Sequence, residues 1–397
     1  MGGEIAAQGD ERLVQSLGSA LDVSADEAAV MADVHGFHSY PARLHPLTAA
    51  RLIEAFSPAR GRVLDPFCGS GTVLVEARRL GRHAFCVDIN PLAIELAHLK
   101  ARGANGSERQ ALLEAAARVA AHADDRRLKR AGPSRRYGPE DRELFDVHVL
   151  LELDGLKSGI ESIREPFERH ALLLVLSSIM TKLSRRKGDS TGARVEKRLA
   201  AGHAVRLFSR KATDLVRRLE AFERTLPAAS PPARVALGDA RKLPHVRPRS
   251  IDLVVSSPPY PGVYDYFSQH VQRLRWLDLG TGRFEAGELG ARRKLNKLGG
   301  DAALRHWEQE LLPCLGQIAR VLAPGGKAVL VVADSVLGGR PVYAEDLLRG
   351  LVPRAGLNVV AAASQLRPHF HFATRGAFKA RPRREHALLL QSGSVSS

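Results

Sequence analysis

The chain has 397 residues, 44% of them hydrophobic and 26% charged, which is typical of a globular protein with one large, interrupted domain or with two domains. Its longest apolar run, residues 171–176, is far shorter than the roughly 20 residues of a membrane span, and its start lacks the apolar stretch of a signal peptide. Three cysteines without metal-ligand spacing indicate reduced thiols, so we expect a cytoplasmic protein with no metal site and no membrane partner.

The net charge of +16 is concentrated in one part of the chain. Residues 181–250 carry 18 Lys and Arg against 6 Asp and Glu, whereas residues 101–180 carry 13 of each kind. A local excess of positive charge favours a polyanionic partner such as a nucleic acid. A solvated surface in an arginine-rich protein would have the same composition, so charge alone leaves both interpretations open.

The first third of the chain alternates between strand and helix patterns. Residues 1–33 are expected to form a polar, partly helical lead-in, and residues 45–56 a helix with one apolar face. Two short strands, each followed by a helix, come next: 62–64, 73–80, 83–87 and a helix from Pro91. This order predicts an α/β fold with a mostly parallel, helix-covered sheet.

The alternation stops in residues 102–232, which we expect to be a helical, basic insertion. It resumes in residues 233–397, and we assign residues 34–101 and 233–397 to one core. The last two predicted strands have no helix between them and therefore fit an antiparallel pair at one sheet edge. The predicted elements of this part are strands at 234–237, 251–255, 327–332, 357–363 and 386–390, and helices at 304–322 and 343–351.

A glycine-containing turn joins the first strand to its helix in the stretch VLDPFCGSGT. Glycines at such a turn let the backbone approach a ligand, which lies beyond the carboxyl ends of parallel strands. An acid ends each of the first two strands, Asp65 and Asp88, and the second stands about where a ribose-binding carboxylate belongs. The glycines alone would also suit an ordinary tight turn.

The stretch DPFCGSGT resembles motif I of the DNA amino-methyltransferases that use S-adenosylmethionine, and FHSYPARLHP at 37–46 resembles their motif X. The resemblance implies the class I methyltransferase fold, Rossmann-like, with a mostly parallel seven-stranded sheet, an antiparallel edge and S-adenosylmethionine as cofactor. It also implies that Asp88 holds the ribose and that Asp239 lies beside the adenine. The implied cofactor-binding residues are Tyr40, Pro41, Asp65, Pro66, Phe67, Gly69, Gly71, Thr72, Asp88, Asn90 and Asp239.

The strand at 251–255 runs into Ser257-Pro258-Pro259-Tyr260. An exocyclic amine of a base is a poor nucleophile, and acceptors placed on its protons favour a reactive geometry. Two prolines fix two φ angles and remove two N–H donors, which leaves a rigid corner rich in carbonyls. The tyrosine ring can stack on a flipped base. A proline-terminated strand with a core tyrosine is the simpler alternative.

S-P-P-Y resembles motif IV of the same family. The resemblance implies that the Ser257 hydroxyl and the Pro258 carbonyl hold the amine, with Tyr260 as the stacking platform; the four residues of the motif, Pro259 included, form the predicted catalytic site. Serine at this place favours N4 of cytosine, and N6 of adenine stays open. The chain also contains one Pro-Cys dipeptide, Pro313-Cys314. We expect Cys314 to lie in a helix away from the glycine turn and not to act as a nucleophile.

The insertion is our candidate for target recognition, because recognition regions of this family vary and are often inserted into the core. Its place between the second and third strands departs from the family's usual arrangement, and a solvated helical face is the alternative. Double-stranded DNA is the expected partner. The predicted nucleic-acid contacts are Lys182, Arg185, Arg186, Lys187, Arg194 and Arg198. A second candidate contact is the loop at 367–371, whose two histidines also allow a weaker metal interpretation.

Other functions remain open at this point. An RNA guanine-N2 methyltransferase of the tRNA type has a similar Pro-Pro-Tyr motif, with RNA as partner, although only about 35 residues precede motif X here. A protein-glutamine methyltransferase is disfavoured by the serine and by the basic insertion. A catalytically silent DNA-binding protein would have lost cofactor or amine-binding residues, and none is missing. The enzyme would act alone or beside a cognate restriction endonuclease.

Overall fold

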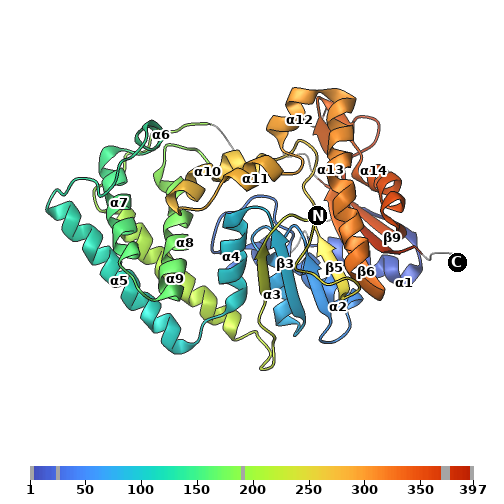
Figure 1. The fold of residues 1–397 in the computed structure, drawn as a ribbon, viewed down its shortest axis with the longest axis horizontal. Helices are drawn as coiled ribbons and strands as arrows, with labels where there is room; N and C mark the ends of the chain where they lie inside the picture. Colours follow the sequence, from blue (N-terminus) through green and yellow to red (C-terminus); the bar gives the residue numbers. More distant parts are fainter. Residues whose placement is uncertain (1–3, 24–26, 189–192, 368–375, 394–397) are drawn as a thin grey trace.

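A twisted eight-stranded sheet forms the centre of the molecule, with helices on both faces (Figure 1). The computed structural model describes residues 4–23, 27–188, 193–367 and 376–393. The strand order is β1-β9-β10-β6-β5-β2-β3-β4. The strands of this sheet are β1 Ile5–Gly9, β2 Arg62–Asp65, β3 His83–Asp88, β4 Arg234–Leu237, β5 Ile251–Ser256, β6 Leu322–Ala333, β9 Leu357–Leu366 and β10 Arg384–Ser392.

The predicted fold class is confirmed. Strands β2 to β6 pair in parallel, whereas β10 runs antiparallel to both of its neighbours, β6 and β9. Among the described residues between β9 and β10 there is no helix, as the sequence predicted. Because parallel strands end at the same edge, the segments that follow β2, β3, β4 and β5 meet there.

One strand was not predicted. We expected residues 1–33 to be a helical lead-in, but β1 pairs antiparallel with β9 and extends the sheet to an eighth strand. The stretch IAAQG is short and exposed throughout, so it has no alternation of buried and exposed residues that could identify a strand. Its pairing with β9 makes it a strand. The helices that follow β1 are α1 Glu11–Leu21, η1 Glu27–Met31 and η2 Asp33–Gly36, so the segment is partly helical, as predicted.

Successive side chains of the central strands pack into two separate hydrophobic cores, one on each face of the sheet. Leu253 and Val255 of β5 pack with α1 to α4 on one face, whereas Val254 between them packs with α13 and α14 on the other. This alternation is the period of two of a strand that is buried on both faces. The helices are α2 Pro46–Phe56, α3 Thr72–Arg79, α4 Pro91–Arg102, α13 Gly300–Val321, α14 Ala344–Leu351 and the short η3 Pro353–Ala355.

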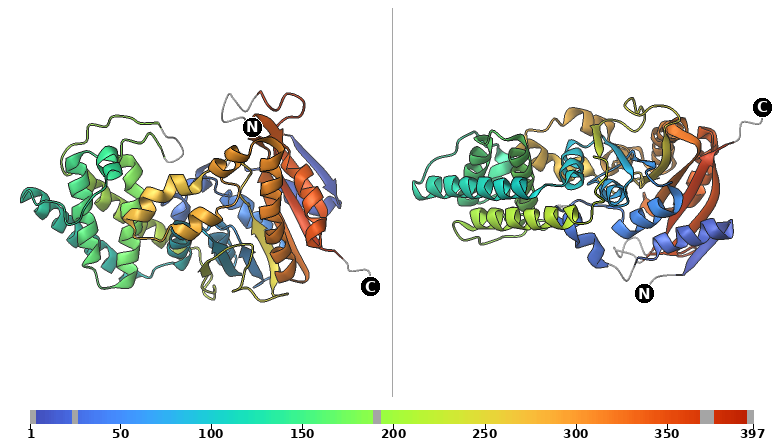
Figure 2. Two further views of the ribbon diagram at one scale, coloured as in Figure 1. Left: turned by 45° about the horizontal axis from the view of Figure 1, so that its top comes forward. Right: turned by 90° about the horizontal axis from the view of Figure 1, so that it is seen from below.

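The predicted insertion is helical and lies between β3 and β4. Figures 1 and 2 show its helices gathered at one end of the molecule, beside the sheet. Its apolar side chains, such as Leu153 and Leu176, continue the core that α1 to α4 build on the sheet. The helices are α5 Gly106–Leu128, α6 Pro139–Leu144, α7 Val147–Glu161, α8 Pro166–Leu183 and α9 His203–Glu223.

Three helices follow β5 where the sequence showed no clear pattern: α10 Tyr266–Trp276, α11 Gly282–Gly287 and α12 Arg292–Leu298. Helix α10 connects the core to the insertion, and Arg273 contacts both. Arg273 donates Nη2 hydrogen bonds to Ser39 Oγ (3.2 Å) and Thr181 Oγ1 (2.8 Å), so it ties the motif X segment to α8. A hairpin of β7 Ser335–Leu337 and β8 Arg340–Val342 completes the fold. In the part of the chain that the structure describes, no helix is both long and apolar enough to cross a membrane.

Candidate active site

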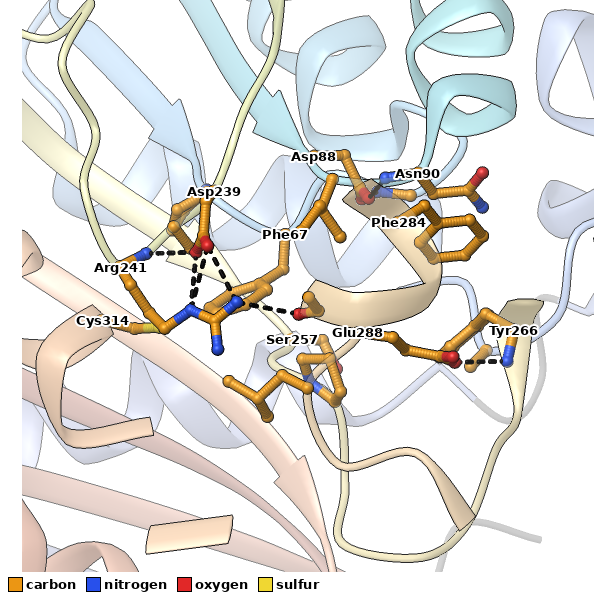
Figure 3. A pocket seen from close by; sticks show the side chains of 18 of the residues that line it. Phe67, Asp88, Asn90, Asp239, Arg241, Ser257, Tyr266, Phe284, Glu288 and Cys314 are labelled. Atoms are coloured by element: carbon orange, nitrogen blue, oxygen red, sulfur yellow. Dashed lines mark hydrogen bonds and ion pairs between the residues drawn. The ribbon is translucent and has the colours of Figure 1, made fainter. Parts of the chain in front are cut away.

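A pocket opens at the carboxyl ends of β2 to β5, where the predicted motifs meet (Figure 3). Figure 3 shows Asp88 and Asn90 on one side of it, and Asp239 with Arg241 on the other. The predicted residues that line it are Tyr40, Pro66, Phe67, Gly69, Asp88, Asn90, Asp239, Ser257 and Pro259. The lining residues that sequence reasoning missed are Ala42, Ile89, Ala240, Arg241, Tyr266, Phe284, Gly287, Glu288, Leu289 and Cys314.

The glycine turn has the geometry that its sequence requires. Gly69 and Gly71 have φ angles of +48° and +86°, which favour glycine. A Cβ at Gly71 would lie 2.8 Å from the Ala97 Cα, so this glycine seats α3 against α4 rather than lining the pocket. Thr72 is buried at the start of α3, and neither it nor Pro41 lines the pocket. Direct cofactor contact by these three residues stays a prediction.

Asp88 organises the turn from the end of β3. Its Oδ2 accepts a hydrogen bond from the Gly69 N–H (2.8 Å), and its Oδ1 accepts one from the Asn90 N–H (2.9 Å). Burial raises the pKa of Asp88 to about 6, against the effect of these backbone donors. Each oxygen keeps a further lone pair. The carboxylate can therefore hold the protein turn and a ligand hydroxyl together.

Asn90 links Asp88 to the motif X segment. Its Oδ1 accepts a hydrogen bond from the Leu92 N–H (3.1 Å) and caps α4, while its Nδ2 donates to the Tyr40 hydroxyl (3.0 Å). The Tyr40 ring stacks on His270 of α10 with its centroid 5.0 Å away. Tyr40 is thereby fixed over Gly69, whose missing Cβ would lie 3.2 Å from the Tyr40 ring.

Asp65 lies beneath the turn and does not line the pocket, unlike the other predicted acids. It is 4% exposed and accepts hydrogen bonds from Ser256 Oγ (2.5 Å) and from the Phe67 N–H (3.1 Å). Burial raises its pKa to about 7, and these two donors offset part of that rise. Its position indicates that it joins the ends of β2 and β5 and shapes the loop between them. Direct cofactor binding by Asp65 remains a prediction.

Asp239 at the end of β4 is paired with a residue that sequence reasoning missed. Arg241 donates to both oxygens, from Nε to Oδ1 (2.9 Å) and from Nη2 to Oδ2 (2.8 Å). Burial would raise the pKa of Asp239, but the hydrogen bonds from Arg241 outweigh it and lower that pKa. Arg241 Nη2 also donates to the Gly287 carbonyl (3.0 Å), so it joins β4 to α11 across the pocket. The sequence pattern that could have identified Arg241 is its place two residues after Asp239.

Motif IV follows β5 directly. The Ser257 hydroxyl lies 3.1 Å from the Tyr260 hydroxyl, and the Pro259 carbonyl accepts a hydrogen bond from the Trp307 indole Nε1 (3.0 Å). Burial raises the pKa of Tyr260, so its phenol stays protonated. Ser257 and Pro259 line the pocket, whereas Pro258 and Tyr260 do not. The roles predicted for these four residues stay predictions.

A buried ionic cluster closes the pocket from the side of α11. Glu288 accepts a hydrogen bond from the Tyr266 N–H (2.6 Å) and pairs with Arg293 (2.5 Å), which also pairs with Asp265. Burial raises the pKa of Glu288 against the opposing effect of Arg293. The cluster fixes the chain between α10 and α12, including pocket residues Phe284 and Leu289. No local sequence pattern connects acids and a base that are this far apart in the chain.

Cys314 lies on α13, as expected, but its side chain lines the pocket rather than standing away from it. Burial raises the pKa of this thiol to about 12, which keeps it protonated. It serves as an apolar part of the pocket wall. All three cysteines are free and buried, and the described residues contain no cluster of His, Cys, Asp or Glu that could hold a metal ion.

The predicted nucleic-acid contacts of the insertion differ in whether they pair with acids of the protein. Lys182, Lys187 and Arg198 are exposed. Arg194 is exposed as well, but it pairs with Glu143 at 2.5 Å, and Arg185 pairs with Asp146 at the same distance. Arg186 forms a β-bridge with Arg194. These arginines hold the segment after α8 against α6 and the start of α7. The other predicted loop, with His369 and His371, lies outside the described residues, whereas its neighbour Arg367 pairs with Glu385 (2.6 Å).

A DNA methylase family model matches residues 23–99, which include motif X, the glycine turn and Asp88. Residues 23–99 carry the signature of that family. The match confirms the predicted resemblance to N4/N6 DNA amino-methyltransferases over this segment, and with it S-adenosylmethionine as the cofactor.

Individual relatives match short stretches of the chain. The Type II methyltransferase M.MvaI of Kocuria varians is 42% identical over 62 residues, which are 15% of this chain and 14% of that protein. The Type II methyltransferase M.ScaI of Streptomyces caespitosus is 37% identical over 59 residues, 15% of this chain and 19% of that protein. The match therefore spans less than a fifth of either relative's length.

Among solved structures, the rRNA methyltransferase aviRa from Streptomyces viridochromogenes aligns with 93% of this chain and 94% of its own. Its sequence identity is 15% and the TM-score is 0.33, a similarity too low to argue from.

The pocket residues fit S-adenosylmethionine in their chemistry. Phe67, Ile89 and Leu289 provide apolar walls suited to a purine ring, and Asp88 provides a carboxylate suited to ribose hydroxyls. Gly69 keeps the backbone open beside Tyr40. These residues would hold the cofactor.

Proposed function

We propose that the protein is an S-adenosylmethionine-dependent DNA methyltransferase that acts on the exocyclic amine of a flipped base, N4 of cytosine. One observation carries the proposal: Ser257 and Pro259 of motif IV line the same pocket as Tyr40, Gly69 and Asp88. A pocket shared by cofactor residues and amine-holding residues is what direct methyl transfer requires.

The catalytic task of this chain is to orient the amine. When bound, S-adenosylmethionine supplies an electrophilic methyl group on sulfur. The Ser257 hydroxyl and the Pro258 carbonyl accept hydrogen bonds from the two amine N–H groups, which turns the nitrogen lone pair toward the pocket. The hydrogen bond between Ser257 and Tyr260 fixes the serine hydroxyl, and the Tyr260 ring supports the base.

Cytosine is our preferred base because serine stands first in the motif, and adenine N6 is the alternative. Double-stranded DNA is the proposed partner, which exposed Lys182, Lys187 and Arg198 of the insertion would contact. In this proposal residues 102–232 serve as the recognition region. The enzyme would work in the cytoplasm in DNA modification, alone or beside a cognate restriction endonuclease.

The test is methyl transfer from labelled S-adenosylmethionine to double-stranded DNA, followed by digestion to nucleosides. We expect N4-methylcytosine, lost with Ser257→Ala and strongly reduced with Tyr260→Ala. Tyr260→Phe keeps the ring and removes only the contact with Ser257, so it should retain more activity than Tyr260→Ala. Ser230→Ala is the control, because Ser230 donates to the Arg78 carbonyl (2.9 Å) away from the pocket.

Three results would change the proposal. N6-methyladenine as the product would keep the mechanism and overturn the choice of base. Label in RNA but not in DNA would replace the substrate. No transfer to either nucleic acid, by protein that binds the cofactor, would refute the enzyme function.

A further inference from the structure

We propose that Trp307 is a positioning residue for methyl transfer, because its indole holds the Pro259 carbonyl and leaves the Pro258 carbonyl as the diproline acceptor for the amine. The proposal rests on the proposed function and adds a residue that no motif contains. Trp307 does not line the pocket, so it acts through Pro259.

The diproline makes the choice of acceptor important. Neither proline has an N–H, so the two prolines offer carbonyl oxygens and no backbone donor. Trp307 occupies one of them: its Nε1 lies 3.0 Å from the Pro259 oxygen, and the tryptophan is 4% exposed. A buried indole N–H must find an acceptor, so this hydrogen bond fixes the ring and the carbonyl together. Trp307 thus engages one lone pair of the Pro259 oxygen and fixes its direction, and in this proposal the Pro258 carbonyl is the diproline acceptor for the amine.

A second contact from the same helix reinforces this arrangement. Glu310, one turn after Trp307 on α13, accepts a hydrogen bond from the Gly290 N–H (3.3 Å), and the Gly290 carbonyl accepts one from the Gly262 N–H (3.1 Å). Gly290 has a φ of +68°, and a Cβ there would lie 3.2 Å from both the Trp307 ring and the Tyr260 carbonyl. Helix α13 therefore holds the motif IV turn and the neighbouring chain as one unit.

This geometry predicts a specific kinetic effect. Loss of the indole N–H would free the Pro259 carbonyl and let the amine-binding corner shift, while the cofactor contacts of Asp88 and Tyr40 stay unchanged. A misplacement of reacting groups by about 1 Å can cost roughly 100-fold in rate. We therefore expect kcat to fall about tenfold or more, with no change in cofactor affinity.

The chain offers a matched control, because its only other tryptophan makes the same kind of bond elsewhere. Trp276 is also 4% exposed, and its Nε1 donates to Asp141 Oδ1 (2.9 Å) at the contact between α10 and α6. Benzothienylalanine has nearly the shape of tryptophan, with sulfur in place of the N–H. Placed separately at each position, it removes one hydrogen bond and leaves no cavity.

Methyl transfer to DNA, cofactor affinity by calorimetry and melting temperature would be measured for the full chain and both replacements. We expect Trp307→benzothienylalanine to lower kcat about tenfold or more with unchanged cofactor affinity, whereas Trp276→benzothienylalanine keeps kcat. Trp307→Phe should show the same loss of kcat.

Unchanged kcat at Trp307, an equal loss at Trp276, or a change in cofactor affinity alone would overturn the positioning role while the unmodified enzyme stays active. An inactive unmodified protein would refute the proposed function, and the positioning role with it.

Discussion

The pocket at the sheet edge and the helical insertion were both predicted to bind ligands, and the structure treats their residues differently. Around the pocket, predicted residues from four strands converge. In the insertion, Lys182, Lys187 and Arg198 are exposed, whereas Arg185 and Arg194 form ion pairs within the protein. A parallel sheet brings its strand ends to one edge whatever the side chains are, but a charge on a loop lies where local packing puts it. Motif residues at strand ends are thus more predictable than charged residues in bulk.

The largest expected effect tests two acids of the site, Asp65 beneath the glycine turn and Asp88 in the pocket wall. Burial raises the pKa of Asp65 to about 7 and of Asp88 to about 6, above the 3.8 of an exposed aspartate. Between pH 4 and 7 the folded state therefore binds more protons than the unfolded state, and stability must fall as pH rises through this window. For Asp65 alone the fall is on the order of 4 kcal/mol.

Denaturant unfolding at pH 4.5 and pH 7.5 would measure this slope, which Asp65→Asn should reduce. Asp346→Asn, at an exposed ion pair with Arg381, is the control and should leave the slope unchanged. A stability that rises over the same interval would contradict the burial argument.

Next in size is the effect of a methyl group at the glycine turn. Gly71→Ala would place a Cβ 2.8 Å from the Ala97 Cα at a φ of +86°. The overpacking and the backbone strain together should lower the free energy of unfolding by about 3 kcal/mol. Gly132→Ala is the matched control, since a Cβ at Gly132 has no atom within 4 Å. Equal stability of the two variants in denaturant unfolding would show that the turn can relax.

Asp88→Asn should weaken cofactor binding more than it weakens the fold. The amide keeps a single acceptor oxygen, so it must give up either a backbone donor or the ligand hydroxyl. Hydrogen bonds to a charged group contribute about 1.5–3 kcal/mol, and we expect roughly 10- to 100-fold weaker affinity for S-adenosylmethionine by calorimetry. Asp239→Asn, whose oxygens are engaged by Arg241, should weaken cofactor binding less. The reverse order would mean that Asp239 is the main cofactor acid.

The smallest effect separates the exposed from the paired cations of the insertion. Reversing Lys182, Lys187 and Arg198 to Glu should weaken DNA binding regardless of sequence and lower the salt slope of log K by about 3, with little change in stability. Arg185→Ala with Arg194→Ala should instead lower stability slightly, mainly through the Arg185–Asp146 pair, because the Arg194–Glu143 pair is exposed to solvent. Filter binding over a salt series would measure the first effect. Unchanged binding would remove the insertion from the DNA interface.

Much of the fold followed from local pattern. The strands β2 to β6, β9 and β10, the place of the insertion and the glycine turn were all predicted, because hydrophobic period, glycine and proline act over a few residues. The exposed strand β1 had no such period, and α10 to α12 had no repeat strong enough to identify them. These elements take their structure from the sheet, the insertion and the ionic cluster around Arg293.

The residues of the candidate site also differ in whether local sequence could predict them. Local sequence was enough to predict Gly69, Asp88, Ser257 and Pro259. A positive φ, a strand end or a proline restricts the backbone at its own place in the chain. Arg241 meets Gly287, Glu288 meets Arg293 and Trp307 meets Pro259 only after the helices that follow β5 have packed over the sheet edge. Burial then makes each of these polar contacts necessary, since a buried donor or charge without a partner is costly. Pairings of this kind depend on which surfaces meet, and tertiary packing alone decided them.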